Sequence, residues 1–162
     1  MSELSRKAVV VKEDEAEKVT FPSAVARLLV DATGVGGALS CHHVQLSMGA
    51  DGSSPHYHAK SSELFYVIDG SLQMLLEDEV VTAEKGSLVV VPPGMPHCFA
   101  APPQDLAEVL IVLTPGIERF GYFHLLKEVI EGGATADDLA AAEGLYDSHS
   151  VDSPVWRATR AR

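Results

Sequence analysis

The sequence predicts an all-β domain followed by a short helical tail. From residue 24 to 113, short runs rich in Val, Leu, Ile, Phe and Tyr are separated by Gly, Pro, Asp and Ser. This pattern is typical of the many short strands of a sandwich or barrel. After residues 114–116 the apolar residues follow a helical spacing instead. We therefore expect an acidic arm over residues 1–20, a β-barrel over 21–115 and a helical tail over 116–162.

The elements are expected in the following order. Residues 12–18 are highly charged and fit either a mobile arm or an added edge strand. The apolar runs that follow are interrupted by turn residues, for example at Asp69-Gly70 and at Pro102-Pro103. These runs predict strands at 26–31, 38–48, 55–58, 63–69, 71–77, 80–83, 87–91, 96–100 and 106–113.

The tail carries two helix signals. Four apolar residues share one helical stripe: Phe120, Phe123, Leu126 and Ile130. Gly132-Gly133 is expected to end this helix. Thr135 and Asp138 have the spacing of a capping box, which predicts a second helix to about Leu145. The remaining residues, from Asp152 onward, are expected to be irregular.

Composition limits the possible partners. The 162 residues include 12 Lys and Arg against 23 Asp and Glu, for a net charge of −11. Such a chain is poorly suited to nucleic acid or to an anionic membrane surface, because both bind through basic side chains. No apolar run approaches the ~20 residues of a membrane helix, or the ~7–15 of a signal peptide. With only two cysteines, Cys41 and Cys98, we expect a cytoplasmic protein.

Histidines and a carboxylate are concentrated in two places. His56 and His58 point to one face if residues 55–58 form a strand, and a turn over 59–62 would bring Glu63 back to the same face. His97 follows a buried strand and a Pro/Gly turn, so it completes the set if the sheet closes. An isolated His-x-His is more often coincidence. Three imidazoles and one carboxylate suit Fe, Mn, Co, Ni, Cu or Zn, and do not suit Ca or Mg.

Taken together, the two segments resemble the two motifs of the cupin superfamily. The first motif appears as His56-x-His58, four residues, Glu63, six residues and Gly70. The second appears as Gly86, five residues, Pro92-x-Gly94, two residues and His97. Two positions depart from the family pattern: six residues separate Gly49 from His56 where five is usual, and Ala101 replaces an asparagine.

The resemblance implies a cupin double-stranded β-helix, a jelly-roll-like barrel of two packed sheets, over about residues 35–115. It also implies one divalent transition metal per chain (Fe, Mn, Ni, Cu or Zn), bound inside the barrel by His56, His58, Glu63 and His97. The helical tail is similar to that of small single-domain cupins related to quercetin dioxygenases.

Three functions are compatible with a cupin that binds a metal through these four residues. Four protein ligands leave about two open positions on an octahedral metal, where substrate or oxygen can bind. The first hypothesis is a dioxygenase acting on an aromatic or enolic substrate, with Glu63 as both ligand and proton acceptor. The second is a metal-dependent isomerase or polyketide cyclase-like cupin. The third is a cupin that binds a small molecule without turnover.

Strand parity predicts which residues line the pocket. The even positions of 41–48 are the more apolar, so they are expected inside: His42, Val44, Leu46 and Met48. His42 could bind substrate or support a metal ligand; a hydrogen-bonded core histidine is the preferred alternative. Phe65 and Val67 share the parity of Glu63, and Phe99 shares that of His97. These three are pocket walls or core packing, and such a lining suits a hydrophobic or aromatic substrate.

The sequence also indicates assembly. The apolar strand 106–113 and the helical tail are candidate contact faces, and symmetric dimers are the commonest oligomers. The cupin resemblance points the same way. We therefore expect a homodimer, with His43 exposed or at the subunit contact.

Overall fold

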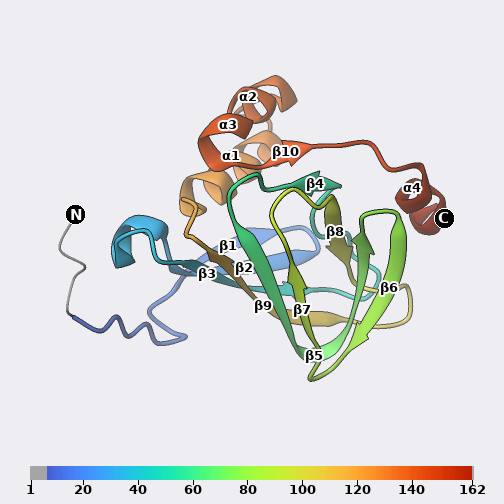
Figure 1. Cartoon of the computed structure of the whole chain (residues 1–162), viewed down its shortest axis with the longest axis horizontal. Helices are drawn as coiled ribbons and strands as arrows, with labels where there is room; N and C mark the ends of the chain where they lie inside the picture. The colour runs from blue at the N-terminus through green and yellow to red at the C-terminus, as the bar shows by residue number, and fades with distance from the viewer. Residues whose placement is uncertain (1–6, 162) are drawn as a thin grey trace.

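Within residues 7–161, ten antiparallel strands form two sheets that share one long strand, β5 (Ser62–Leu76). The computed structural model describes residues 7–161 (Figure 1). One sheet contains β1 (Glu17–Phe21), β2 (Ala24–Val30), β3 (Ser40–Leu46), β9 (Ala107–Thr114), β5 and β7 (Leu88–Val91). The other contains β5, β6 (Glu79–Glu84), β8 (His97–Ala100), β4 (His56–Tyr57) and β10 (His149–Ser150). The predicted all-β fold is confirmed.

The long strand β5 replaces two predicted strands. The expected turn at Asp69-Gly70 is wrong, because the chain continues through a register shift between Val67 and Asp69. Gly70 makes this possible. It has a φ of 66°, and a Cβ there would lie 2.0 Å from the carbonyl oxygen of Leu106. Glycine thus lets β5 bend from one sheet into the other.

The interior of the barrel follows the predicted parity along β3. His42, Val44 and Leu46 are buried, whereas the odd positions between them are half-buried. Met48 was expected to continue the buried series, and this is wrong: 66% of it is exposed, because β3 ends at Leu46 and the chain turns. The rest of the core consists of apolar side chains from both sheets, including Phe65, Val67, Leu72, Met74, Val109, Ile111 and Leu113.

The helical tail lies across one end of the barrel (Figure 1). It contains α1 (Phe120–Glu131), α2 (Ala136–Ala141), α3 (Glu143–Tyr146) and α4 (Pro154–Arg160). The capping box of Thr135 and Asp138 is confirmed. The predicted second helix is interrupted at Ala142, which divides it into α2 and α3.

The expectation of an irregular C-terminus is wrong. Helix α4 begins after Ser153, whose Oγ accepts a hydrogen bond from Trp156 N at 3.2 Å, and Pro154 occupies its first turn. A serine followed by proline is a helix-start signal that the sequence contains. Trp156 packs in a second apolar cluster with Leu75, Cys98 and Ala100, so α4 is held on the outside of β8.

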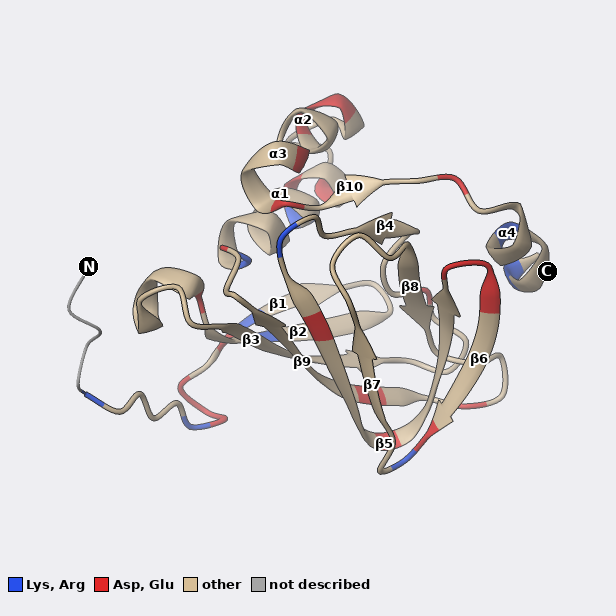
Figure 2. Ribbon diagram, viewed as in Figure 1, with Lys and Arg blue, Asp and Glu red and all other residues tan. Residues whose placement is uncertain are grey.

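At the N-terminal end, residues 17–21 form the edge strand β1, which pairs with β2. This strand crosses the boundary expected between arm and barrel, and residues 1–6 lie outside the described part. Acidic side chains are spread over turns and over α2, while Arg157 and Arg160 lie on α4 (Figure 2). Within residues 7–161, no helix is long and apolar enough to cross a membrane.

Candidate metal centre

Four buried side chains meet inside the barrel. They are the predicted ligands His56, His58, Glu63 and His97, and one ligand atom from each lies within 4.8 Å of all the others. The pairing of β4 with β8 sets His56 directly opposite His97. The turn after β4 returns the chain so that Glu63, at the start of β5, faces the same space. The arrangement is compatible with a single metal site.

The three imidazole rings are held in one orientation by backbone carbonyl groups. The Nδ1 atoms of His56, His58 and His97 lie 2.7, 2.6 and 2.9 Å from the carbonyl oxygens of residues 54, 147 and 95. A carbonyl oxygen can only accept, so each Nδ1 is the protonated donor. In a neutral ring this leaves the lone pair on Nε2, the atom that faces the centre. Such carbonyl contacts are typical of histidines that bind a metal.

The carboxylate of Glu63 faces two imidazole nitrogens at this centre. Its Oε2 lies 2.8 Å from Nε2 of His58 and 2.6 Å from Nε2 of His97. A carboxylate oxygen repels the lone pair of a neutral imidazole at such distances. Either protons or a metal ion must lie between them, and a transition metal matches this mixed nitrogen and oxygen donor set. The residues present therefore fit the metal that the motifs imply.

The ionisation of the centre agrees with this geometry. Burial opposes the charged form of Glu63, but the close contacts with the rings of His58 and His97 outweigh it and hold the pKa of this carboxyl well below its usual range. Burial, with the neighbouring His97, lowers the pKa of His56 to about 3. Burial also opposes protonation of His97, yet the contact with Glu63 raises its pKa. The centre thus holds an ionised carboxylate and a neutral His56.

Asp147 connects the C-terminal tail to the centre, a role that the sequence did not predict. Its carbonyl oxygen accepts the hydrogen bond from His58, and its carboxylate accepts from the backbone N–H groups of Ala59 and Lys60 at 3.0 and 2.9 Å. Its φ of 45° is in the left-handed region, which aspartate tolerates better than most residues. No local sequence signal marks this role, since 89 residues separate Asp147 from His58.

The family follows from sequence and fold together. A family model described as Cupin domain matches residues 42–113. A solved structure of an RmlC-like cupin from Shewanella frigidimarina is 19% identical, with a TM-score of 0.59 over 70% of this chain and 96% of that chain. Residues 42–113 therefore form a cupin domain, and the fold of the described chain is that of cupins. The resemblance to quercetin dioxygenases in particular stays a prediction.

Two further cupin-like structures show how widely the fold is shared. KdgF from Halomonas sp. is 24% identical, with a TM-score of 0.55 over 64% of this chain and 92% of that chain. The polyketide cyclase RemF from Streptomyces resistomycificus is 17% identical, with a TM-score of 0.55 over 76% of this chain and 98% of that chain. At these identities the likeness concerns the fold alone. No curated protein matches the sequence.

The cupin barrel contains a cavity of about 450 Å³ beside the centre. His56 and Glu63 form part of its wall, so the centre faces the cavity on one side. Much of the remaining lining is apolar and comes from β1, β2, β3, β8 and α1: Phe21, Ala24, Ala26, Val44, Leu46, Phe99, Phe123, Leu126 and Ile130. This volume is within the range of small-molecule sites. The stripe predicted on α1 therefore faces the cavity along part of its length.

The predicted pocket residues divide into two groups. His42 and Phe99 line the cavity. Phe65 and Val67 are fully buried and lie outside the cavity lining within residues 7–161; the ring of Phe65 packs edge-on against those of His97 and Phe99. Nδ1 of His42 is buried without a hydrogen-bond partner among the described residues, so His42 is not a fully hydrogen-bonded core histidine.

Arg119 and Tyr122 are cavity residues that the sequence reasoning missed. Both lie at the start of α1, and the apolar stripe was the feature that drew attention to this helix. His43, expected on the surface or at a subunit contact, is half-buried on the outer face and pairs with Glu108 at 2.7 Å.

Proposed function

We propose that this cupin is a metal-dependent enzyme acting on a small, mainly apolar molecule with an aromatic or enolic group. One observation carries the proposal: His56 and Glu63 belong both to the four-residue centre and to the wall of the cavity. A ligand in the cavity would therefore meet the metal on its open side. Within residues 7–161, His58 and His97 belong to the centre but do not line the cavity, so they would hold the metal on the side away from the cavity.

His56, His58, Glu63 and His97 would hold one divalent ion, which we propose to be Fe, Mn, Ni, Cu or Zn. When bound, such an ion polarises an oxygen atom of substrate or water. The protein contributes the rest. The apolar wall orients the substrate and excludes bulk water, and the ionised Glu63 is placed to accept a proton from a bound hydroxyl group.

For the reaction itself, we propose a dioxygenase as the first candidate. The mixed donor set suits the metals that such enzymes use, and a mainly apolar cavity suits a flat aromatic substrate. Molecular oxygen would be the co-substrate, with both of its atoms entering the product. The second candidate is a non-oxidative isomerase or cyclase. It is favoured by the likeness to the polyketide cyclase RemF over 98% of that chain.

Oxygen uptake distinguishes these candidates. The metal-reconstituted protein would be given a flavonol or a catechol in an oxygen electrode, and also under anaerobic conditions with product analysis. Consumption of oxygen in step with substrate supports the dioxygenase. Product formed without oxygen supports the isomerase or cyclase. If these ligands raise the melting temperature and no product forms, the proposed enzymatic function is wrong and the protein only binds small molecules.

A matched pair of variants tests the role of Glu63. Glu63→Gln removes the proton acceptor and a charged ligand, so turnover is expected to fall at least a hundredfold. Glu79→Gln changes an exposed glutamate of β6 and should leave turnover unchanged. Equal activity in the two variants would exclude Glu63 from the reaction.

We also propose the homodimer and the cytoplasmic location that the sequence predicts. Strand β9 pairs on both edges, with β3 and β5, so a dimer would not form by adding a strand there. Exposed apolar side chains lie instead on β5 and β7: Tyr66, Ile68, Leu88 and Val90. Light scattering of the wild type and of Val90→Glu tests whether this face joins two copies.

A further inference from the structure

Unpartnered polar atoms are concentrated at the cavity. Within the described residues, five buried side-chain nitrogen or oxygen atoms have no hydrogen-bond partner. Four of them belong to Arg119, His42 and Ser53, and all three residues line the same cavity. Buried polar groups are normally paired, so unpaired ones that share a cavity indicate a missing polar ligand.

Arg119 is the most informative of these residues. Only 6% of it is exposed, and Nε and Nη1 have no partner among residues 7–161. Asp31 hydrogen-bonds to the backbone, since its Oδ1 accepts the N–H of Arg119 at 2.6 Å, and among the described residues it forms no ion pair with the guanidinium group. The guanidinium group lies 4.1 Å above the ring of Tyr122 and 5.8 Å from that of Phe123. Aromatic contacts of this kind compensate only part of the cost of burying a charge.

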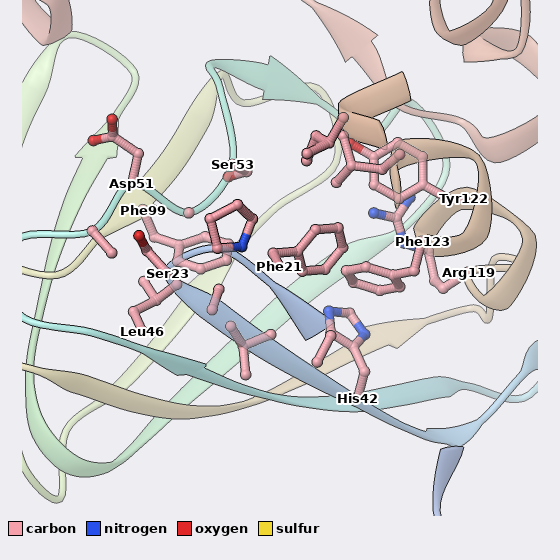
Figure 3. Close-up of a pocket in the computed structure, with 18 of the residues that line it drawn as sticks. Phe21, Ser23, His42, Leu46, Asp51, Ser53, Phe99, Arg119, Tyr122 and Phe123 are labelled. Atoms are coloured by element: carbon pink, nitrogen blue, oxygen red, sulfur yellow. The ribbon is translucent and has the colours of Figure 1, made fainter. Parts of the chain in front are cut away.

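His42 contributes a second polar group to the cavity. It comes from β3, on the sheet, whereas Arg119 comes from the start of α1 (Figure 3). The edge of its ring contacts Phe123, with a centroid distance of 4.9 Å. Burial and the charge of Arg119 lower the pKa of His42 to about 3, so the ring is neutral and can donate one hydrogen bond.

Other charges near the cavity do not supply the missing partner. Asp51, at the cavity wall, pairs with Arg160 at 2.8 Å. Glu63 is engaged with His58 and His97. A divalent ion at the centre would exceed the single charge of Glu63, so positive charge would dominate the buried lining.

We propose that Arg119 and His42 form a subsite for the carboxylate of the substrate, which is otherwise apolar and aromatic. This inference rests on the proposed function, because it assigns the substrate class of the same cavity. Phe21, Val44 and Phe99 would contact the aromatic body. Arg119 would form a charge-assisted hydrogen bond, and His42 would donate the neutral one.

Binding measurements on the metal-loaded protein test this subsite with two probes of nearly equal shape. The probes are 2-naphthoate and its neutral analogue 2-naphthamide, with affinities determined by calorimetry. Wild type is expected to bind the carboxylate about tenfold to a hundredfold more tightly, the range that a hydrogen bond between charged groups provides. Arg119→Gln should bind both probes equally. Arg119→Lys, which keeps the charge, should restore part of the preference.

Controls separate the subsite from the metal and from folding. Metal content per chain is measured for each protein, and Arg119→Gln is expected to retain the wild-type value. Arg157→Gln, on the exposed face of α4, should preserve the carboxylate preference. Since Arg119 is a buried charge without an anionic partner among residues 7–161, Arg119→Gln is expected to melt at or above the wild-type temperature. A structural arginine would give a lower melting temperature instead.

Two results would overturn the subsite. One is wild-type protein that binds the two probes equally. The other is Arg119→Gln that keeps the full carboxylate preference, which would show that the metal takes the anion. If the protein binds no metal and the preference still depends on Arg119, the subsite stands and the proposed metal-dependent function fails.

Discussion

Asp147 joins the C-terminal tail to the centre. Asp147→Asn should therefore lower the free energy of unfolding and the affinity for metal. Its carboxylate accepts hydrogen bonds from the backbone of Ala59 and Lys60, next to His58. A hydrogen bond to a charged group contributes about 1.5–3 kcal/mol, so the pair contributes about 3 kcal/mol at the lower limit. Asparagine keeps one neutral bond of about 1 kcal/mol. The free energy of unfolding should therefore fall by about 2 kcal/mol.

Urea unfolding is the assay for this loss. The single tryptophan, Trp156, is buried in α4 of the tail, so its fluorescence reports on docking of the tail, and far-UV circular dichroism reports on the barrel. Asp137→Asn is the control, since Asp137 is an exposed acidic residue of α2. If Asp147→Asn loses no more stability than this control, the carboxylate of Asp147 does not stabilise the docked tail.

The same variant should also bind metal less tightly. The carbonyl oxygen of Asp147 accepts the Nδ1 hydrogen of His58 at 2.6 Å, and a displaced loop would disturb that contact. Changes to such outer contacts commonly cost about 10- to 100-fold in metal affinity. Competition with a chelator would measure the change. An unchanged affinity would mean that the loop keeps His58 in position without the carboxylate.

Three further predictions follow from the structure. Burial opposes ionisation of Asp147, but the backbone N–H donors outweigh burial and lower the pKa of this carboxyl. The stabilisation that the ionised carboxyl gives is therefore complete above about pH 4, and it is lost as the pH falls through the lower pKa of the folded state. The stability difference between wild type and Asp147→Asn should narrow below pH 4 in urea titrations. Gly70→Ala should lower the free energy of unfolding by more than about 2 kcal/mol, because a Cβ would clash with Leu106. Gly86→Ala is the control: its φ is also positive but the space around it is open, so the loss should be about 1–2 kcal/mol. Ser153→Ala removes the cap of α4 and should cost about 1 kcal/mol in the same assay.

Local spacing explains why the four-residue centre could be predicted. His56, His58 and Glu63 belong to one hairpin, where strand parity and a short turn determine which side chains face each other. His97 required only that the sheet close, and the cupin motifs implied that it does. The helix cap at Thr135 is also a local signal, and it too is confirmed.

The parts that sequence reasoning missed depend on long-range packing. Arg119 enters the cavity because α1 covers that end of the barrel, and Asp147 meets Ala59 across 88 residues of chain. Strand parity correctly indicated that Phe65 and Val67 are buried. Parity could not show whether they pack in the core or line the cavity, because the curvature of the barrel determines which inward side chains reach the cavity. The long strand β5 was divided in two because Gly70 was interpreted as a turn rather than a bend.

The proposed function depends on one metal ion bound by His56, His58, Glu63 and His97. Elemental analysis of untagged protein, prepared without chelator and reconstituted with each candidate metal, tests it most directly. We predict about one equivalent per chain for wild type and for His124→Ala, which changes an exposed histidine of α1. His58→Ala should retain less than about a tenth of an equivalent. Full metal occupancy in His58→Ala, or none in reconstituted wild type, would contradict the account.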